Sequence, residues 1–450
     1  MRKLFGTDGI RGVANIEPMT AEMAYKLGKC CAIYFTRDKK ERIVFLIGKD
    51  TRLSCDMLEN AITAGLCSYG VDVIKIGILP TPAVAYLTKK YKADCGIMIS
   101  ASHNSFEDNG IKLFSNKGHK LSENIEDDLT KMLHEENIPV NKPLGSAIGR
   151  VVEDKNAVKD YLSYVISTIP VNTNLSSLKI VVDCANGATS YIAAELFENL
   201  GIKIKLKHNK PTGTNINLNC GSLYPHGISS EIKKAKYNAG LCFDGDGDRV
   251  IALDENGEMI DGDYIMAICS KYLFHDKKHP KKILITTTMS NIGLEKFTQE
   301  FGIKMIRTNV GDKYVLEEML KIGAILGGEQ SGHIIFKEFS TTGDGIITAL
   351  QLLSIMANEN KKLSSLSKVM KKYPQILINI PVKSKVDFHS IPELHQVIDE
   401  IEKEIENNGR LVLRYSGTEP LARIMLEGYD ENKIKKIGNR LADAIKLNIG

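Results

Sequence analysis

The sequence predicts a multidomain α/β protein in which three repeated α/β domains precede a smaller α+β domain. Two observations support this class. The chain has 450 residues, which exceeds the size of one ordinary core and indicates about three or four domains. Three stretches also repeat one order of elements, and the residues from about 371 onward depart from it.

Each repeat has the pattern of a βαβ unit. A β-rich apolar run is followed by a polar turn, an amphipathic helical pattern, a glycine and a second apolar run. The glycine is expected to end the helix in the left-handed conformation. The three units span residues 42–77, 178–208 and 281–309, with Gly70, Gly201 and Gly302 as the helix-ending glycines.

The C-terminal part has a different order of elements. We expect a strand over 373–382, a charged helix over 391–409, a strand–turn–strand segment over 410–430 and a helix over 431–447. Residues 361–373 are interpreted as the connector that leads into this part. The predicted domains are therefore residues 1–152, 153–254, 255–370 and 371–450.

Composition excludes several classes of protein. Hydrophobic residues make up 43% and charged residues 25% of the chain, as in soluble globular proteins. The net charge of +4 comes without a dense Lys/Arg block, so nucleic acid is not an expected partner. No apolar run reaches the ~18 residues that a membrane span needs. Nine cysteines without a CxxC pair suggest reduced thiols in the cytoplasm.

The segment AGLCFDGDGDRV (239–250) predicts a metal site. Asp244, Asp246 and Asp248 alternate with glycines after an apolar run. Because alternate residues of an extended chain point to one side, the three carboxylates are expected to converge. At a spacing of ~5 Å, each pair of like charges costs roughly 3 kcal/mol at an effective dielectric near 20. A cation offsets this cost, and carboxylate ligands favour Mg²⁺ or Ca²⁺.

A calcium-binding EF-hand loop is the alternative at this segment. With Asp244 as its first position, Glu255 falls at the twelfth, but Arg249 stands at the sixth, where that loop needs glycine. The flanking residues also read as a strand and a hairpin rather than as helices. An arginine beside three aspartates suits an anionic substrate, so Mg²⁺ that meets a phosphate is favoured.

A polar loop, ISASHNSFEDNGIKLF (99–114), follows another buried strand. A serine hydroxyl is a poor nucleophile until a base or a metal assists it. Ser100, Ser102 or Ser105 could supply an oxygen, or a phosphate bound to it, to the metal. These residues alone leave the three serines as alternatives.

Two further segments have the composition of binding loops. In RYSGTEPLAR (414–423), a Ser-Gly-Thr turn lies between Arg414 and Arg423, and such groups can hold an anion. In GGEQSGHIIF (327–336), Glu329 and Ser331 could bind hydroxyl groups and His333 could move protons. A hairpin turn with solvated arginines and a structural histidine are the plain alternatives.

Together these motifs resemble the α-D-phosphohexomutase superfamily over nearly the whole chain. In the superfamily's order they are FGTDGIRG, GKDTRLS, ISASHN…DNGIK, NINLNCGS, FDGDGDR, TNVGDKYV, GGEQSGH and RYSGTEP. The resemblance implies a heart-shaped arrangement of four domains, three of them repeated α/β units with mixed sheets and the last a smaller α+β domain. The repeat described above agrees with it.

The resemblance also implies a reaction, that of an intramolecular phosphotransferase of the isomerase class. Ser102 would carry a phosphoryl group and give it to a sugar phosphate. The resulting sugar bisphosphate would be both intermediate and activator, and its other phosphoryl group would return to Ser102. One Mg²⁺ per subunit would lie among the Ser102 phosphate, Asp244, Asp246 and Asp248, where it would neutralise charge.

The same resemblance assigns roles to other residues. Lys112 and His333 would be the acid/base pair, and Arg11 and Arg249 would lie beside the transferring group. Glu329 and Ser331 would hold sugar hydroxyls. The non-transferring phosphate would be bound by Arg414, Ser416, Gly417, Thr418 and Arg423.

Gln330 resembles the bacterial branch of the superfamily that acts on glucosamine phosphates. That branch interconverts glucosamine 6-phosphate and glucosamine 1-phosphate on the route to UDP-N-acetylglucosamine, a peptidoglycan precursor. The expected partner is the sugar phosphate, and a homodimer is one expected assembly. Two residues depart from the superfamily's pattern: Ser105 replaces a proline, which frees φ there, and Lys313 replaces an arginine, which removes a bidentate contact.

Two other classes of function stay open at this point. A metal-dependent phosphohydrolase would use Ser102 and the aspartates but needs no second phosphate site such as 414–423. A non-catalytic calcium module would need neither Lys112 nor His333. Isomerisation without phosphate release would separate the three.

Overall fold

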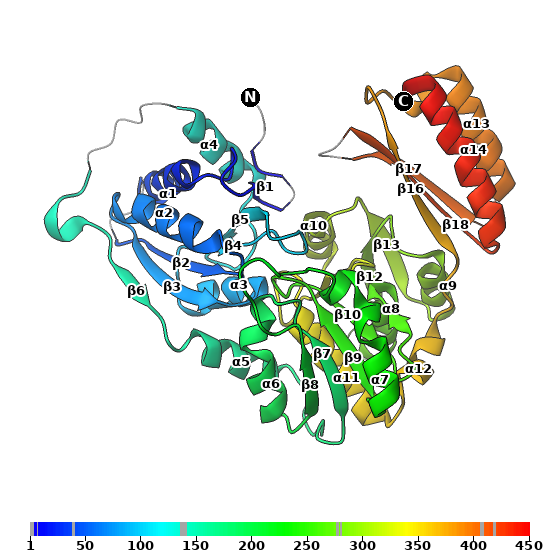
Figure 1. The fold of residues 1–450 in the computed structure, drawn as a ribbon, viewed down its shortest axis with the longest axis horizontal. Helices are drawn as coiled ribbons and strands as arrows, with labels where there is room; N and C mark the ends of the chain where they lie inside the picture. Colours follow the sequence, from blue (N-terminus) through cyan, green and yellow to red (C-terminus); the bar gives the residue numbers. More distant parts are fainter. Residues whose placement is uncertain are drawn as a thin grey trace.

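The computed structural model describes residues 4–6, 8–37, 41–135, 142–275, 279, 281–405, 409–416 and 420–450. Within these residues, sheets of six, five, four and three strands follow one another along the chain. In Figure 1 the first domain (blue to cyan) and the C-terminal domain (orange to red) form two upper lobes, with the second and third domains below and between them. The predicted fold class is confirmed.

The first sheet is mixed and has the order β1-β5-β4-β2-β3-β6. Its strands are β1 (Ile10–Val13), β2 (Val44–Lys49), β3 (Asp72–Ile78), β4 (Cys95–Ile99), β5 (Asp108–Ser115) and β6 (Val151–Glu153). The helices of this part are α1 (Ala21–Thr36), α2 (Cys55–Cys67), α3 (Thr81–Lys90) and α4 (Glu123–His134). Strands β4 and β5 are antiparallel neighbours, so the polar loop that joins them lies where β4 ends and β5 begins.

The second sheet has the order β11-β10-β9-β7-β8. Its strands are β7 (Lys179–Asp183), β8 (Lys203–Lys207), β9 (Ala239–Phe243), β10 (Val250–Leu253) and β11 (Met259–Ile260), and its helices are α5 (Ala157–Ser167), α6 (Ala193–Asn199) and α7 (Ser229–Ala235). The β10–β11 hairpin is the one predicted after the aspartates. Because β11 pairs with β10, we propose that the second domain extends beyond residue 254 to Ile260.

The third sheet has the order β13-β12-β14-β15, with only β15 antiparallel to its neighbour. Its strands are β12 (Ile283–Thr287), β13 (Lys304–Thr308), β14 (Leu326–Gly328) and β15 (Ile334–Phe336). Its helices are α8 (Gly262–Leu273), α9 (Ile292–Glu300), α10 (Asp312–Ile322) and α11 (Gly345–Glu359). The loop between β14 and β15 carries the GGEQSGH motif.

The fourth sheet is antiparallel, with the order β16-β18-β17. Its strands are β16 (Gln375–Pro381), β17 (Gly409–Tyr415) and β18 (Leu421–Gly428), covered by α13 (Pro392–Ile405) and α14 (Glu431–Ile449). The predicted connector forms α12 (Leu363–Leu366) and a short 3₁₀ turn, η5 (Ser367–Val369). Leu363 and Leu366 are buried in the main core, so the connector is packed rather than loose.

The remaining short elements are 3₁₀ turns. They are η1 (Gly145–Ala147), η2 (Ala188–Tyr191), η3 (Gly221–Leu223), η4 (Pro225–Ile228) and η6 (Phe388–Ser390). The three glycines predicted to end helices have φ of +83° at Gly70, +71° at Gly201 and +64° at Gly302. This left-handed conformation is the one that glycine adopts at lowest cost, and the prediction is confirmed.

The C-terminal domain does not share the apolar core of the first three domains. One continuous core includes Leu46, Val182 and Leu353 and so joins the first three domains. The C-terminal domain has a core of its own. A change in the position of that domain therefore does not require the main core to open. Among the helices of the described residues, none has the length and apolarity that a membrane crossing requires.

Candidate active site

One serine of the polar loop after β4 points towards the aspartates. Ser102 is buried, and its hydroxyl donates a hydrogen bond of 2.7 Å to Oδ2 of Asp244. The backbone of Ser102 has a φ of +52°, which a residue with a side chain adopts only when its surroundings enforce it. Ser100 does not face the three aspartates, because its hydroxyl donates to Asp50 at 2.6 Å.

The three aspartates converge as predicted, but by a different backbone path. Asp244, Asp246 and Asp248 each offer an oxygen within 4.8 Å of the others. They lie in a turn after β9 rather than in extended chain, and Gly247 in that turn has a φ of +68°. Strands β9 and β10, not helices, flank the turn, which excludes an EF-hand.

The aspartate cluster fits a divalent metal. Burial, and then the charges of Asp248 and Asp246, raise the pKa of Asp244 well above its usual value. Within the described part of the chain, Oδ1 of Asp246 and Oδ1 of Asp248 are buried and accept no hydrogen bond. Buried polar atoms without a partner are rare in proteins. Carboxylate oxygens in this state are suitable ligands for a hard cation.

Lys112 lies at the same cluster from strand β5. Its ammonium group is 2.9 Å from Asp246, 3.6 Å from Asp248 and 3.5 Å from Asp8. Burial lowers the pKa of Lys112, but the charges of Asp246, Asp8 and Asp248 outweigh burial and raise it. The group is therefore protonated at neutral pH in the metal-free protein.

The charges around Lys112 continue into the third domain. Lys120 contacts Asp8 at 2.7 Å and Asp312 at 2.6 Å. His333 lies 3.5 Å from Asp248 and 3.7 Å from Asp312. Acidic and basic groups thus alternate in a closed ring that connects the aspartate cluster with α10.

His333 is held in one tautomer by its hydrogen bonds. Its Nε2 accepts a hydrogen bond of 3.0 Å from the backbone N–H of Gly343, so Nε2 carries a lone pair and Nδ1 carries the proton that faces Asp248. Burial lowers the pKa of His333, but Asp248 and Asp312 raise it above its usual value. We assign the neutral ring, because a protonated ring would have no lone pair for Gly343.

A cleft of about 590 Å³ lies next to the aspartate turn, and residues of all four domains line it. Arg249, Glu329 and Ser331 line it, together with His103 and Arg423. Glu329 accepts a hydrogen bond of 3.2 Å from the N–H of Gly311, and its burial raises its pKa. Arg11, from β1, is paired with Asp8 and so lies at the edge of the charged ring.

Two arginines of the C-terminal domain face each other. Arg414 on β17 and Arg423 on β18 are direct cross-strand partners, where like charges repel. Burial and the charge of Arg423 lower the pKa of Arg414. A bound anion would relieve this repulsion. Ser416 is buried and its N–H donates to Leu421 O at 2.8 Å, whereas Gly417 and Thr418 lie outside the described residues.

The two departures from the superfamily's pattern have structural partners. Lys313 forms an ion pair of 2.9 Å with Glu123 on α4, so it links the third domain to the first. The carbonyl of Ser105 accepts a hydrogen bond from Arg52, which restrains the loop where proline is replaced.

Sequence reasoning gave no role to several residues of this site. His103 lies 3.4 Å from the Ser102 hydroxyl, and the charge of Arg249 together with burial lowers its pKa to about 3. Asp8 and Lys120 complete the charged ring, and Arg52 and Asn217 contact the serine loop. In the sequence these residues are marked only by their place in or near the superfamily's motifs, because each contact joins residues that are far apart in the chain.

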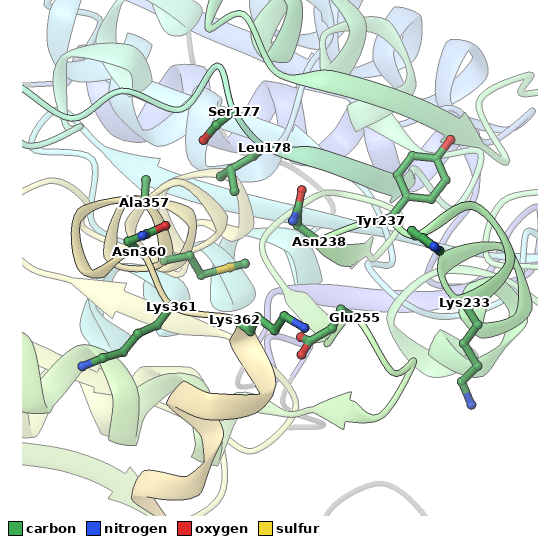
Figure 2. Close-up of a pocket in the computed structure, with 12 residues that line it drawn as sticks. Ser177, Leu178, Lys233, Tyr237, Asn238, Glu255, Ala357, Asn360, Lys361 and Lys362 are labelled. Carbon is green, nitrogen blue, oxygen red and sulfur yellow. The ribbon is translucent and has the colours of Figure 1, made fainter.

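A second cavity of about 580 Å³ lies between the second and third domains. Figure 2 shows that the ammonium groups of Lys233 and Lys361 point away from it, and that Lys362 faces Glu255. Its charges do not converge on a ligand position. Asp183, His208 and Cys220 form a second group that could hold a metal ion. The hydrogen bonds that Asp183 accepts from backbone N–H groups and from His208 explain this group without a metal.

Known proteins resemble this chain over its whole length. A curated protein named "Phosphoglucosamine mutase" from Pelobacter propionicus is 49% identical over 450 residues, which is 100% of this chain and 99% of that protein. A phosphoglucomutase/phosphomannomutase family protein from Burkholderia thailandensis has a crystal structure that matches with a TM-score of 0.81 at 21% identity, covering 99% of both chains. The structure of Aspergillus fumigatus N-acetylphosphoglucosamine mutase with GlcNAc-6P and magnesium matches with a TM-score of 0.68 at 16% identity, covering 98% of this chain and 95% of that one.

Family comparison divides the chain in the same way as the four sheets. Residues 2–138, 159–257 and 261–373 match "Phosphoglucomutase/phosphomannomutase, alpha/beta/alpha domain" I, II and III, and residues 377–444 match the family's C-terminal domain. The matches cover most of the chain, and they agree with an enzyme of the isomerase class. The chain belongs to the phosphoglucomutase/phosphomannomutase family of phosphohexomutases.

Proposed function

We propose that this phosphohexomutase interconverts glucosamine 6-phosphate and glucosamine 1-phosphate and so supplies UDP-N-acetylglucosamine synthesis. The observation that carries the proposal is the hydrogen bond of 2.7 Å from the Ser102 hydroxyl to Asp244. The neighbouring residues His103 and Arg249 line a cleft that an arginine of the C-terminal domain, Arg423, also lines. The sugar is inferred from the relatives named phosphoglucosamine mutase.

Ser102 is proposed to carry a phosphoryl group in the resting enzyme. In the first half of the reaction the bond from phosphorus to Ser102 Oγ breaks, and a bond forms to the free hydroxyl oxygen of the substrate. That hydroxyl loses its proton and Ser102 Oγ gains one. The second half reverses these changes at the other phosphate of the bisphosphate, so one phosphoryl group returns to Ser102.

The residues around Ser102 fit a bound Mg²⁺. Asp244, Asp246, Asp248 and the Ser102 phosphate would hold it, and two carboxylate oxygens of this set accept no hydrogen bond in the described structure. When bound, the ion neutralises charge on the transferring phosphoryl group. The Aspergillus fumigatus relative was solved with magnesium and GlcNAc-6P, which supports the choice of metal.

Lys112 and His333 are proposed to move the protons. Lys112 carries a proton because three aspartates surround it, and it is proposed to donate that proton to the departing oxygen. His333, whose Nδ1 lies 3.5 Å from Asp248, is proposed as the other member of the acid/base pair. Arg11 and Arg249 lie at the borders of the same site and are proposed to contact the transferring group.

Binding of the sugar is proposed to use two sides of the cleft. Arg414 and Arg423, with Ser416, Gly417 and Thr418, would hold the non-transferring phosphate, and Glu329 and Ser331 the sugar hydroxyls. Gln330 donates from Nε2 to Asp263 at 3.0 Å and to Gln375 at 3.2 Å. Its remaining polar atom, Oε1, is an acceptor, which suits an amine at C2 of the sugar.

We also propose a cytoplasmic location, because the nine cysteines are free thiols.

Phosphorus NMR tests this function. Purified protein with Mg²⁺ and a trace of glucosamine 1,6-bisphosphate should convert glucosamine 6-phosphate to glucosamine 1-phosphate without releasing inorganic phosphate. Release of phosphate would instead show a phosphohydrolase. No change in the spectrum would favour a non-catalytic metal-binding module.

A further inference from the structure

We propose that Arg52 and Asn217 are positioning residues that hold Ser102 in the conformation in which its hydroxyl faces Asp244. This inference rests on the proposed function of Ser102. It concerns residues from two domains, because Arg52 precedes α2 in the first domain and Asn217 lies between β8 and η3 in the second.

All five N–H donors of Arg52 are used by the serine loop and its support. Nε donates to Asp50 at 2.9 Å. Nη2 donates to the carbonyls of Ser102 at 3.0 Å and Asn104 at 2.9 Å, and Nη1 donates to the carbonyls of Ser105 and Asp108. The guanidinium is fully buried. Arg52 therefore has no donor left for a substrate phosphate, although it lies beside the phosphorylation site.

Asn217 makes the same connection from the second domain. Its Nδ2 donates to the carbonyl of Ser102 at 2.9 Å and to the carbonyl of Asn104 at 2.9 Å. These are the two oxygens that Nη2 of Arg52 also contacts. A side chain on Gly245 would lie 2.6 Å from Ser102 O and 2.8 Å from Asn217 Nδ2, so the metal loop approaches this point closely.

The N–H of Ser102 is fixed from the same network. It donates to the hydroxyl of Ser100 at 2.8 Å, and that hydroxyl donates to Asp50, the partner of Arg52. Both polar groups of the Ser102 backbone are thus held while φ is +52°. A left-handed non-glycine residue is strained and persists only when its surroundings enforce it. The hydrogen bonds from Arg52 and Asn217 to the Ser102 carbonyl hold the residue in this conformation.

Two substitutions separate positioning from a general structural role. Arg52→Lys keeps the charge but offers three donors at one point instead of a planar fork of five. Asn217→Gly removes the amide and suits the φ of +58° at this position. Each variant should lower kcat by about 100-fold, as a displaced reacting group does, and should leave KM for glucosamine 6-phosphate within about threefold.

Matched controls exist in the same domains. Arg42 also pairs with an aspartate, Asp72, and donates to loop carbonyls of Ser146 and Ile148, but it lies outside the cleft. Asn219 has a φ of +52° and is exposed. Arg42→Lys and Asn219→Gly should keep the wild-type kcat even if they lower the thermal midpoint as much as the test variants do.

The closing experiment measures kcat, KM and thermal midpoint for wild type and these four variants, with a crystal structure of Arg52→Lys or, if it does not fold, of Asn217→Gly. We expect the loss of kcat in the two test variants alone, and a Ser102 that has left positive φ and lost its contact with Asp244. A test variant with wild-type kcat, or with Ser102 unchanged in the crystal, would overturn the proposal. If wild type itself does not isomerise the sugar phosphate, the proposed function fails, and the crystal structure still decides whether Arg52 and Asn217 hold Ser102.

Discussion

The hydroxyl of Ser102 donates a hydrogen bond of 2.7 Å to Oδ2 of Asp244, across 142 positions of the sequence and from one domain to the next. The serine oxygen and the carboxylates of the aspartate cluster therefore share one buried position at the junction of two sheets. This single contact connects the polar loop after β4 with the acidic turn after β9, and the first prediction rests on it.

Ser102→Ala should remove a covalent phosphate and almost all mutase activity. Intact mass of the purified wild type should show an addition of about 80 Da on at least part of the molecules. Ser105→Ala is the matched control, since Ser105 contributes its carbonyl rather than its hydroxyl to Arg52, and it should keep the adduct. A phosphate that maps to Ser100 or Ser105 instead would refute the assignment.

Asp244→Asn should abolish Mg²⁺ binding without lowering the stability of the metal-free protein. Burial and the neighbouring charges of Asp248 and Asp246 raise the pKa of Asp244, so its ionised form destabilises the fold, and asparagine removes that repulsion. Wild type should gain thermal stability on addition of Mg²⁺, whereas the variant should not. Full activity of the variant, or wild-type activity that survives thorough chelation, would rule out the metal site.

Arg414→Ala should raise KM for the sugar phosphate much more than it lowers kcat, because it removes a charge-assisted contact to the non-transferring phosphate. Because Arg414 directly faces Arg423, the ligand-free variant should be no less stable than wild type. Arg440→Ala, which removes an exposed pair with Glu404 in the same domain, should leave KM unchanged. An unchanged KM in Arg414→Ala would place the phosphate site elsewhere.

Asp263→Asn should change how stability depends on pH. Burial and the charge of Asp261 raise the pKa of Asp263 to about 7. A raised carboxyl pKa gives stability that is present below about pH 4 and is lost as pH rises towards 7. Asparagine mimics the protonated group, so the variant's advantage in unfolding free energy over wild type should grow between about pH 4 and 7 and reach about a few kcal/mol. Urea unfolding measures this, with the exposed Asp128→Asn as control, and parallel pH profiles for wild type and Asp263→Asn would contradict it.

The sequence was most informative where function depends on local spacing. The three aspartates lie within five residues, and the helix-ending glycines follow an apolar period, so both could be predicted. The path of the aspartates could not, because the turn at Gly247 is set by its close approach to Pro80 and Thr189 of other segments.

Residues that act through distant contacts could not be predicted from the sequence. Arg52 lies 50 positions from Ser102 and Asn217 lies 115, and no periodicity relates them. Lys313 lies in the TNVGDKYV motif, but its partner is Glu123, 190 positions away. Such pairings depend on how domains pack, which local patterns do not encode.

We propose that this chain is a phosphoserine mutase with a preference for glucosamine phosphate. The decisive measurement is kcat/KM for glucosamine, glucose and mannose 6-phosphates, compared side by side with Mg²⁺ and the matching bisphosphate. We predict a value for glucosamine 6-phosphate at least about tenfold above the others, with residual activity on both, because the sugars differ by few polar groups. A higher value for glucose or mannose 6-phosphate would contradict the claim.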